Sequence, residues 1–338
     1  MEVAVVGAGS WGTAVARHLA LQGHRVRLWS RGEEVARGVN ETHRNPRYIP
    51  SCDLPASLVA DTDLGRCLEG AEAAVYVVPS HALRATLRSS APHVGAELPV
   101  AVLTKGIEAG TGKLMTDLAV DELGCEGRIA CLSGPNHAEE IARDLPAAAV
   151  VASRNPQTAA FFQRLFHTDR FRTYASCDVV GVEVCAAAKN VVALACGIVA
   201  GMGLGDNTSA VIMTRGLAEM GRLVSACGGN PLTCMGLAGM GDLVATCTSA
   251  HSRNRTFGTA FVGGESLAEF EERTHMVVEG ARACRSVRTL ASRLDVEVPI
   301  ADAVYSLLYE GLSLEEVAAR LYARSPRGEF YGLDAKGA

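Results

Sequence analysis

The sequence has no closely spaced cysteines, no excess of positive charge and no recognisable leader. Its 11 cysteines are scattered without a C-x-x-C pair, so neither a disulfide framework nor a zinc site is expected. The formal net charge of −5 gives no reason to expect binding to nucleic acid or to a membrane surface. No basic segment precedes the first apolar strand, so no secretory signal is expected. These absences indicate a reduced, cytoplasmic protein without a metal.

A long uninterrupted apolar run is also lacking. Residues 179–205 come closest, but Glu183, Lys189 and Asn190 interrupt them. The uncharged remainder falls short of the roughly 18 residues that a membrane-spanning helix needs. We therefore expect a buried core helix in this segment and no membrane span.

The first half of the chain alternates short hydrophobic runs with helical patterns. A helix is expected at residues 10–21, and strands at residues 3–6, 24–29, 73–78, 100–103, 128–132 and 147–152. Strands that are hydrophobic throughout are typical of a sheet covered by helices on both faces. Residues 1–176 are therefore predicted to form an α/β domain of the Rossmann type, with a doubly wound, mostly parallel sheet.

The second half is expected to be helical. Apolar periodicity predicts helices at residues 179–200, 209–227, 279–294 and 301–309. A last helix begins at Ser313, where Glu316 completes a capping box. Residues 177–338 are therefore predicted to form an all-α C-terminal domain.

Three glycines follow the first expected strand and open the first expected helix. Gly7, Gly9 and Gly12 have the G-x-G-x-x-G spacing. The first glycine permits a tight turn, the second lets a pyrophosphate approach the backbone, and the third lets helix and strand pack closely. The N-terminus of the helix then offers N–H donors to the phosphates. This context predicts a dinucleotide site, and a tight turn without a ligand is the alternative.

The end of the second expected strand bears on the choice between NAD and NADP. An acidic residue there would bond the ribose 2′-hydroxyl and select NAD. The sequence instead has Ser30 and Arg31, and the first carboxylate is that of Glu33. Because Arg31 can pair with a 2′-phosphate, NADPH is expected to be used, with NADH as the other candidate. The alternative interpretation is a solvated surface arginine.

Lys189 is the main candidate for proton transfer. It lies among alanines and valines, where burial of an ammonium group is unfavourable and therefore unusual. Desolvation and a second nearby cation would lower its pKa toward neutrality, which suits a general acid or base. The alternative is a lysine that reaches water from the edge of its helix.

Other polar residues follow expected strands and turns. Lys105 ends one strand, where ligands bind in such sheets, and Gly134 and Asn136 follow another. Asp242 is a candidate to orient the lysine or to bond a substrate hydroxyl, and a turn aspartate after glycine is the alternative. Residues 249–255 combine hydroxyls, an amide and two guanidinium groups, which can together hold a phosphate. A solvated polar loop is the alternative there.

Taken together, these motifs resemble those of bacterial NAD(P)-dependent glycerol-3-phosphate dehydrogenases, nearly from end to end. The combination is specific to that family, whereas no single motif is. The resemblance rests on residues 7–14, 43–45 with Tyr48, 104–106, 133–138, 183–190, 203–208, 214–220, 241–249, 252–255, 277–280 and 303–311.

The resemblance implies reversible reduction of dihydroxyacetone phosphate to sn-glycerol 3-phosphate in the cytoplasm, feeding phospholipid synthesis. It also suggests a homodimer. Lys189 matches the proton-transfer position of the family. Positions matching substrate contacts are Lys105, Gly134, Asn136, Lys189, Asp242, Ser252, Arg253 and Asn254. Positions matching cofactor contacts, with the glycine turn added, are Gly7, Gly9, Ser10, Trp11, Gly12, Arg31, Tyr48, Lys105, Ala138, Arg253, Val277 and Glu279.

Two departures from the family pattern bear on these expectations. Asn136 stands where a serine is common, and Gly32 stands where a second basic side chain often follows Arg31, which weakens the expected preference for NADPH. Three other functions are consistent with parts of the pattern. They are a 3-hydroxy-acid or 6-phosphogluconate dehydrogenase, a sugar-nucleotide dehydrogenase with Cys185 or Cys247 as nucleophile, and a dinucleotide-binding redox sensor without catalysis.

Overall fold

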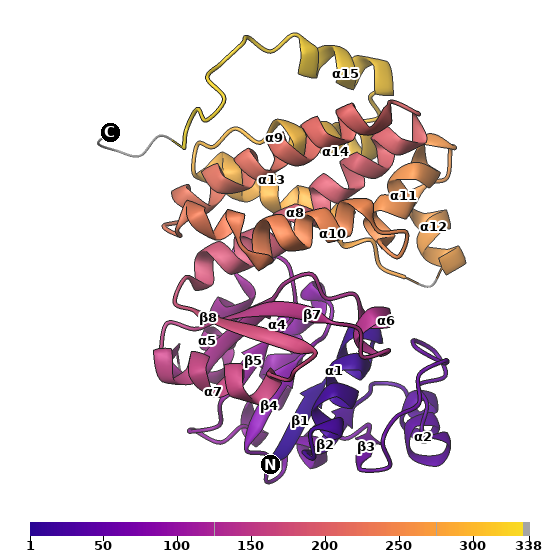
Figure 1. The fold of residues 1–338 in the computed structure, drawn as a ribbon, viewed down its shortest axis with the longest axis vertical. Coiled ribbons are helices and arrows are strands. Elements are labelled where there is room, and N and C mark those ends of the chain that lie inside the picture. Colours follow the sequence, from indigo (N-terminus) through magenta and orange to yellow (C-terminus); the bar gives the residue numbers. More distant parts are fainter. Residues whose placement is uncertain (125, 275, 334–338) are drawn as a thin grey trace. The chain divides into compact units, whose positions relative to one another are not determined.

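The computed structural model describes residues 1–124, 126–274 and 276–333. The chain forms two compact units (Figure 1). A sheet unit contains Met1–Lys105 and Lys113–Val179, and a helical unit contains Gly106–Gly112 and the chain from Val180 onward. The segment Gly106–Gly112 therefore belongs with residues that come much later in the sequence.

The sheet unit is built on one eight-stranded sheet with the strand order β3-β2-β1-β4-β5-β6-β7-β8. All neighbouring strands are parallel except β6 and β7, which are antiparallel. The order reverses direction at β1, as expected for a doubly wound sheet. The strands are β1 (Glu2–Val6), β2 (Arg25–Trp29), β3 (Leu58–Asp61), β4 (Ala73–Tyr76), β5 (Val100–Val102), β6 (Ile129–Ser133), β7 (Ala147–Ala152) and β8 (Phe171–Ser176).

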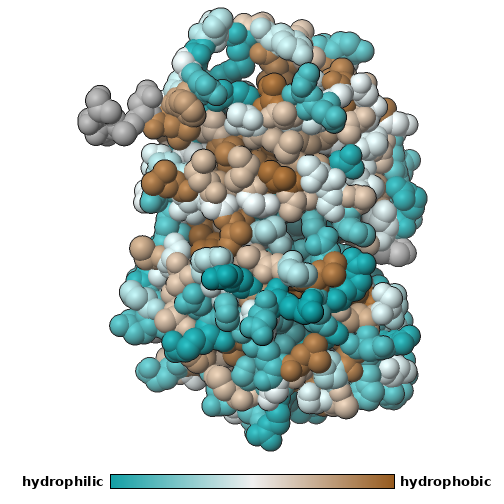
Figure 2. All heavy atoms as spheres, viewed as in Figure 1, coloured by the Kyte–Doolittle hydropathy of each residue, from teal (hydrophilic) through white to brown (hydrophobic). Residues whose placement is uncertain are grey.

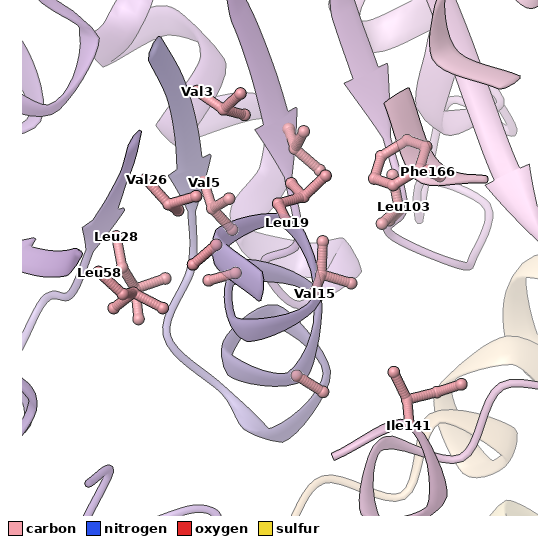
Figure 3. Close-up of a cluster of buried hydrophobic side chains, with 14 of the residues drawn as sticks. Val3, Val5, Val15, Leu19, Val26, Leu28, Leu58, Leu103, Ile141 and Phe166 are labelled. Carbon is pink, nitrogen blue, oxygen red and sulfur yellow. The ribbon is translucent and has the colours of Figure 1, made fainter. Parts of the chain in front are cut away.

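Strand β1 shows how the sequence builds this layer. Val3 and Val5 belong to one buried cluster, whereas Ala4 and Val6 belong to another, because successive side chains of a strand point to opposite faces. Figure 3 shows the first cluster, in which valines and leucines of β1 and β2 lie beside Val15 and Leu19 of helix α1. The predicted doubly wound, mostly parallel sheet is thereby confirmed.

Helices lie on both faces of the sheet. They are α1 (Ser10–Leu21), α2 (Glu33–Thr42), α3 (Leu64–Leu68), α4 (Ser80–Ser90), α5 (Met115–Leu123), α6 (Ala138–Ile141) and α7 (Pro156–Phe166), with short 3₁₀ turns at Ala91–His93 and Glu126–Arg128. The second cluster contains Leu83 and Leu87 of α4 with Met115 and Leu118 of α5. The two edge strands β3 and β8 were not predicted, because each alternates buried with exposed residues and is not hydrophobic throughout.

From Val180 onward the described residues form helices joined by turns and loops, with no strand, as predicted. The helices are α8 (Val179–Gly201), α9 (Gly205–Ala226), η3 (Pro231–Met235), η4 (Leu237–Gly241), α10 (Asp242–Thr248), α11 (Arg253–Val262), α12 (Leu267–Thr274), α13 (Glu279–Arg293), α14 (Pro299–Tyr309) and α15 (Leu314–Tyr322). The predicted capping box is present at the start of α15, where Ser313 and Glu316 exchange hydrogen bonds.

Helix α8 is the centre of this unit. Its length and hydropathy match those of a membrane span, but 83% of its most apolar window is buried inside the protein, as expected for a core helix. It packs closely against α11, since a side chain at Gly258 of α11 would overlap the Leu194 carbonyl oxygen of α8. On the face shown in Figure 2, hydrophobic residues are scattered among hydrophilic ones over the sheet unit and are more frequent over the helical unit.

Candidate active site

The glycine turn has the shape that close packing requires, with open space above its middle glycine. Gly7 has φ of +123°, a conformation that side chains rarely adopt. A side chain at Gly12 would overlap the Gly7 carbonyl oxygen, so the helix lies directly on the turn. In contrast, a Cβ atom at Gly9 would meet no atom within 4 Å. Two glycines thus bring strand and helix together, and the third leaves the backbone open to a ligand.

The N-terminus of α1 is suited to an anionic group. Gly9 is the N-cap residue and provides no side-chain cap, so it leaves the first N–H groups of the helix without a capping bond. The indole Nε1 of Trp11, in the first turn, is buried and has no hydrogen-bond partner among the described residues. These features fit a dinucleotide, whose pyrophosphate would accept hydrogen bonds from the turn.

Asn45 supports the glycine turn through hydrogen bonds of its side chain. In the sequence, residues 43–45 stood out only as part of the family pattern. The side chain of Asn45 is fully buried and donates hydrogen bonds to the Ala8 carbonyl oxygen at 2.9 Å and to the Thr13 hydroxyl at 2.8 Å. Its own oxygen accepts the backbone N–H of Tyr48 at 3.2 Å. The Ser10 hydroxyl in turn donates to the Tyr48 carbonyl oxygen at 3.3 Å. Ser10 and Tyr48, two predicted cofactor residues, are therefore held side by side.

Arg31 lies two residues after the end of β2 and is exposed. Ser30 is buried and its hydroxyl donates to the Gly32 carbonyl oxygen at 3.0 Å, which shapes the turn into α2. The neighbouring strand β3 ends in a carboxylate, Asp61, which sequence reasoning missed. Hydrogen bonds from Arg66 occupy both oxygens of Asp61 and hold its pKa below the ordinary value. Asp61, which pairs in register with Trp29 at the end of β2, is thus already bonded to Arg66.

Three predicted substrate residues meet at the carboxyl ends of β5 and β6. Lys105 follows β5, and its ammonium donates to the Gly134 carbonyl oxygen at 3.3 Å. Asn136 donates to the Ala148 carbonyl oxygen of β7 at 3.1 Å, while its Oδ1 atom is buried and has no partner among the described residues. An unpartnered buried oxygen is unfavourable, so this amide is suited to accept a bond from a ligand. Ala138 begins the short helix α6 and is buried.

Lys189 is buried in the helical unit, where it is paired with a carboxylate. Its side chain is 7% exposed and that of Asp242 is 4% exposed. The ammonium donates to Asp242 Oδ1 at 2.9 Å and to the Thr246 hydroxyl at 2.7 Å. The geometry argues against a lysine that extends to solvent. The charged partner of the ammonium is the Asp242 carboxylate, whereas the sequence pattern had suggested a neighbouring cation.

Thr246 is a site residue that sequence reasoning missed. It lies one turn after Asp242 on α10, so both side chains lie on one face of that helix. Its hydroxyl also donates to the Asp242 carbonyl oxygen at 2.6 Å, which fixes its direction. The spacing of four residues was the only signal in the sequence, and it is too common to be recognised without the fold.

Hydrogen bonds of side-chain amides connect Asn190, next to Lys189, to the beginnings of α11 and α13. Asn254 Nδ2 donates to Asn190 Oδ1 at 2.9 Å, and the Gly280 N–H donates to Asn254 Oδ1 at 2.8 Å. Ser252 caps α11 by accepting the Arg255 N–H. Asn254 and Ser252 are thus buried and used by the fold, which leaves Arg253 exposed at the beginning of α11.

The hydrogen bond that the Gly280 N–H donates to Asn254 brings the beginnings of α11 and α13 together. Glu279 is the first residue of α13, and Val277 precedes it by two positions; both are partly exposed. The predicted site residues are therefore distributed over both units. The glycine turn, Arg31, Tyr48, Lys105, Gly134, Asn136 and Ala138 are in the sheet unit, and the others are in the helical unit.

The alternative with a cysteine nucleophile receives no support from the site, and the described residues offer no metal site. No group of three or more His, Cys, Asp or Glu side chains suited to a metal occurs within the described ranges. A hydrogen bond with Cys196, together with burial, raises the pKa of Cys247, and this disfavours the thiolate that a cysteine nucleophile needs. Cys185 is completely buried.

Comparison with known proteins agrees with this geometry. A family model described as the N-terminus of NAD-dependent glycerol-3-phosphate dehydrogenase matches residues 2–159, and the model of its C-terminus matches residues 178–319. Two relatives named glycerol-3-phosphate dehydrogenase of the NAD(P)+ type are similar over nearly their whole lengths. The protein from Streptomyces griseus is 48% identical over 97% of this chain and 98% of its own. That from Chlorobium luteolum is 46% identical over 97% and 99%.

The fold comparison gives the same answer. A crystal structure of glycerol-3-phosphate dehydrogenase from Coxiella burnetii has a TM-score of 0.91 and 39% identity, and the match covers 96% of this chain and 99% of that one. Both halves of the chain match the same family, in the same order and over nearly all their length. The chain therefore belongs to the NAD-dependent glycerol-3-phosphate dehydrogenase family.

Proposed function

We propose that this protein reduces dihydroxyacetone phosphate to sn-glycerol 3-phosphate with NADPH or NADH, in a reversible reaction that feeds phospholipid synthesis. The observation that carries the proposal is the buried ion pair of Lys189 with Asp242, supported by Thr246. A buried ion pair contributes little to stability compared with an apolar pair, so its presence points to chemistry. Family membership supplies the substrate.

The bound nicotinamide supplies the hydride in this reaction, and the residues of this chain do the rest. The Gly7–Gly12 turn and the start of α1 hold the pyrophosphate, and Trp11 Nε1 is a further donor to the dinucleotide. Arg31 pairs with a 2′-phosphate when NADPH is used. The absence of an acidic side chain at this position makes both cofactors acceptable, and NADPH is the expected preference.

Lys189 donates a proton to the alcohol oxygen of the product, and Asp242 and Thr246 orient its ammonium. Asp242 has a second function, because its carboxylate compensates the charge of the buried ammonium. Lys105 and Asn190 stabilise the negative charge that develops on that oxygen. In the reverse direction Lys189 takes the proton as a base.

The phosphate of the substrate binds at the beginning of α11. Arg253 offers a guanidinium there and is exposed, and the first N–H groups of the helix add to the positive potential. The family resemblance supports assigning Lys105, Gly134, Asn136, Ser252 and Asn254 to the substrate, and Ser252 and Asn254 also hold the start of α11. The family resemblance alone supports assigning Ala138, Val277 and Glu279 to the cofactor. We further propose that the protein acts in the cytoplasm as a homodimer.

An assay of NADPH oxidation with dihydroxyacetone phosphate tests the proposal. We expect turnover with this substrate and none with a 3-oxo acid, and no oxidation of 6-phosphogluconate by NADP+. Turnover with either of the other substrates alone would overturn the substrate assignment. NADPH binding without turnover on any of them would favour the redox sensor.

A further inference from the structure

Two cysteine side chains touch in the helical unit close to the proposed catalytic lysine. The Sγ atoms of Cys185 on α8 and Cys234 on η3 are 3.4 Å apart. The two residues are 0% and 3% exposed, and neither is in a disulfide. The proposed mechanism uses neither thiol.

One thiol lies on the helix that carries Lys189, and the other lies on the segment that leads to Asp242. Cys185 precedes Lys189 by four residues, so both side chains lie on one face of α8. Cys234 lies in the 3₁₀ turn that leads through η4 to Asp242. A bond between the two sulfurs would therefore join the helix that carries the lysine to the segment that carries its carboxylate.

We propose that Cys185 and Cys234 are a thiol-oxidation site, at which a peroxide forms a disulfide that reversibly lowers enzymatic activity. The thiolate of Cys234 attacks hydrogen peroxide, which yields a sulfenic acid and hydroxide. The Cys185 sulfur then attacks the sulfenic sulfur, the S–S bond forms, and the oxygen leaves as water. Two electrons pass from the sulfurs to the peroxide, and a dithiol reverses the change by exchange.

Segment η3 is suited to let a peroxide reach Cys234 and to move toward α8. Its side chains Leu232 and Met235 are 72% and 68% exposed, so Cys234 is a buried residue on a segment that is otherwise open to solvent. Gly228 and Gly229 precede the segment and Gly236 follows it. A disulfide requires the sulfurs to approach to about 2.05 Å, which is a closure of roughly 1.4 Å. A short turn between glycines can make that movement more easily than the core helix α8.

The movement would reach Asp242 through direct backbone contacts. A side chain at Gly239 of η4 would overlap the Cys234 carbonyl oxygen, so the two segments move together. The Gly241 N–H donates to the Gly236 carbonyl oxygen at 3.1 Å, and Asp242 follows at once. Segment η4 is a π-helix, a conformation frequent at functional sites, and it connects directly to α10. A displacement on the order of 1 Å in catalytic geometry lowers turnover by up to about a hundredfold.

The experiment treats the reduced full-length protein with hydrogen peroxide and follows two readouts. Tandem mass spectrometry of the non-reduced tryptic digest should identify a Cys185–Cys234 cross-link. NADPH oxidation with dihydroxyacetone phosphate should slow roughly tenfold to a hundredfold and recover with dithiothreitol. The variants Cys185→Ala and Cys234→Ala should be active and insensitive to peroxide, with the serine variants as replacements if alanine impairs folding.

The matched control is Cys177→Ala, which removes an exposed thiol from the tryptic peptide that contains Cys185. It should remain as sensitive as the wild-type protein. Peroxide inactivation without the cross-link, equal inactivation of Cys234→Ala, or a cross-link that leaves turnover unchanged would each overturn the proposal. The activity readout rests on the proposed function, but the cross-link does not. A reduced protein that is inactive with this substrate yet forms the cross-link would overturn the function and support the oxidation site.

Discussion

At the scale of single residues, Lys189 connects the fold to the chemistry. Its ammonium is held by Asp242 at 2.9 Å and Thr246 at 2.7 Å within a nearly all-apolar helix. Neither partner is close to the lysine in sequence. The lysine itself stood out from its apolar neighbours, whereas its two partners became recognisable only through the packing of α10 on the core.

The first prediction concerns Lys189→Ala. We expect kcat to fall by about 10²–10⁴-fold, because a positioned proton donor contributes that much. The KM for NADPH should change little. Since the variant leaves Asp242 buried without its cation, stability should also fall, by roughly 3–5 kcal/mol. Thr246→Val serves as the comparison, since it removes one orienting bond and retains the ammonium; its kcat should fall less.

Steady-state kinetics and a direct measurement of NADPH affinity check this prediction together. Retained affinity shows that the variant is folded. Near-normal turnover by Lys189→Ala would refute its role as the proton donor.

The second prediction concerns Arg31→Glu. A carboxylate at the end of β2 repels a 2′-phosphate and accepts a bond from a 2′-hydroxyl, so the ratio of kcat/KM for NADPH to that for NADH should fall by about tenfold or more. Arg37→Glu makes the same change of charge on the exposed side of α2 and should leave the ratio nearly unchanged. An unchanged ratio in both variants would show that Arg31 does not contact the cofactor.

At the scale of elements, the glycine turn must pack closely against α1 and also leave room for a ligand. Gly12 lies against the Gly7 carbonyl oxygen, while Gly9 faces open space. We therefore expect Gly12→Ala to lower the free energy of unfolding by about 2 kcal/mol or more, because the helix must move off the turn. Gly9→Ala should leave Tm nearly unchanged and raise the KM for NADPH at least about tenfold, because its methyl group occupies the pyrophosphate position.

The two variants are each other's control, and thermal unfolding with cofactor titration measures both effects. A loss of Tm in Gly9→Ala equal to that in Gly12→Ala would contradict the division of roles.

Helix α14 gives a prediction of pH dependence. Glu219 of α9 is buried and accepts the backbone N–H groups of Ile300 and Ala301 at the start of α14, at 2.9 and 3.2 Å. Burial raises the pKa of Glu219 from 4.5 to about 7, although these bonds and Arg222 oppose the shift. The folded state therefore holds the proton more tightly than the unfolded state does. This contribution, about 3 kcal/mol, is fully present below the unfolded pKa and is lost as the pH rises through 7.

Stability should accordingly fall as the pH rises from about 5 to 7.5, and Glu219→Gln should remove this component of the slope. Urea unfolding across that range measures it. Glu316→Gln is the comparison, because hydrogen bonds from Ser313 lower the pKa of Glu316 and place its titration below the range. Equal slopes for the wild-type protein and Glu219→Gln would disprove the assignment.

The elements that the sequence predicts well are those specified by local patterns. The all-apolar strands, the glycine turn and the Ser313 capping box each depend on a few adjacent residues. The short edge strand Leu58–Asp61, the brace formed by Asn45 and the π-helix at η4 depend on contacts between residues that are distant in sequence. Neither hydrophobic periodicity nor spacing indicates such contacts, and the resemblance to a family does so only where a motif is shared.

At the scale of the whole molecule, the chain passes from one unit to the other three times. The segment Gly106–Gly112 belongs to the helical unit although it follows β5, and residue 113 returns to the sheet unit. Arg293 of α13 anchors the segment by donating to the carbonyl oxygens of Gly110 and Thr111, each at 2.6 Å. The sequence pattern predicts one boundary near residue 176 and gives no sign of this segment.

Arg293→Ala should loosen the segment without disturbing either core. We expect faster hydrogen exchange of the amides of residues 106–112 and a loss of about 1 kcal/mol in the free energy of unfolding. Arg320→Ala, at an exposed position on α15, should change neither. Unchanged exchange in Arg293→Ala would show that other contacts hold the segment.

The passage of this segment into the helical unit also limits how such enzymes can be recombined. A chimaera made by one crossover near residue 180 would join a helical unit from one parent to a Gly106–Gly112 segment from the other. The guanidinium of residue 293 would then face carbonyl groups set by a foreign sequence. Shuffling between relatives should preserve function best when the exchanged block is discontinuous, with residues 106–112 inherited together with the C-terminal half.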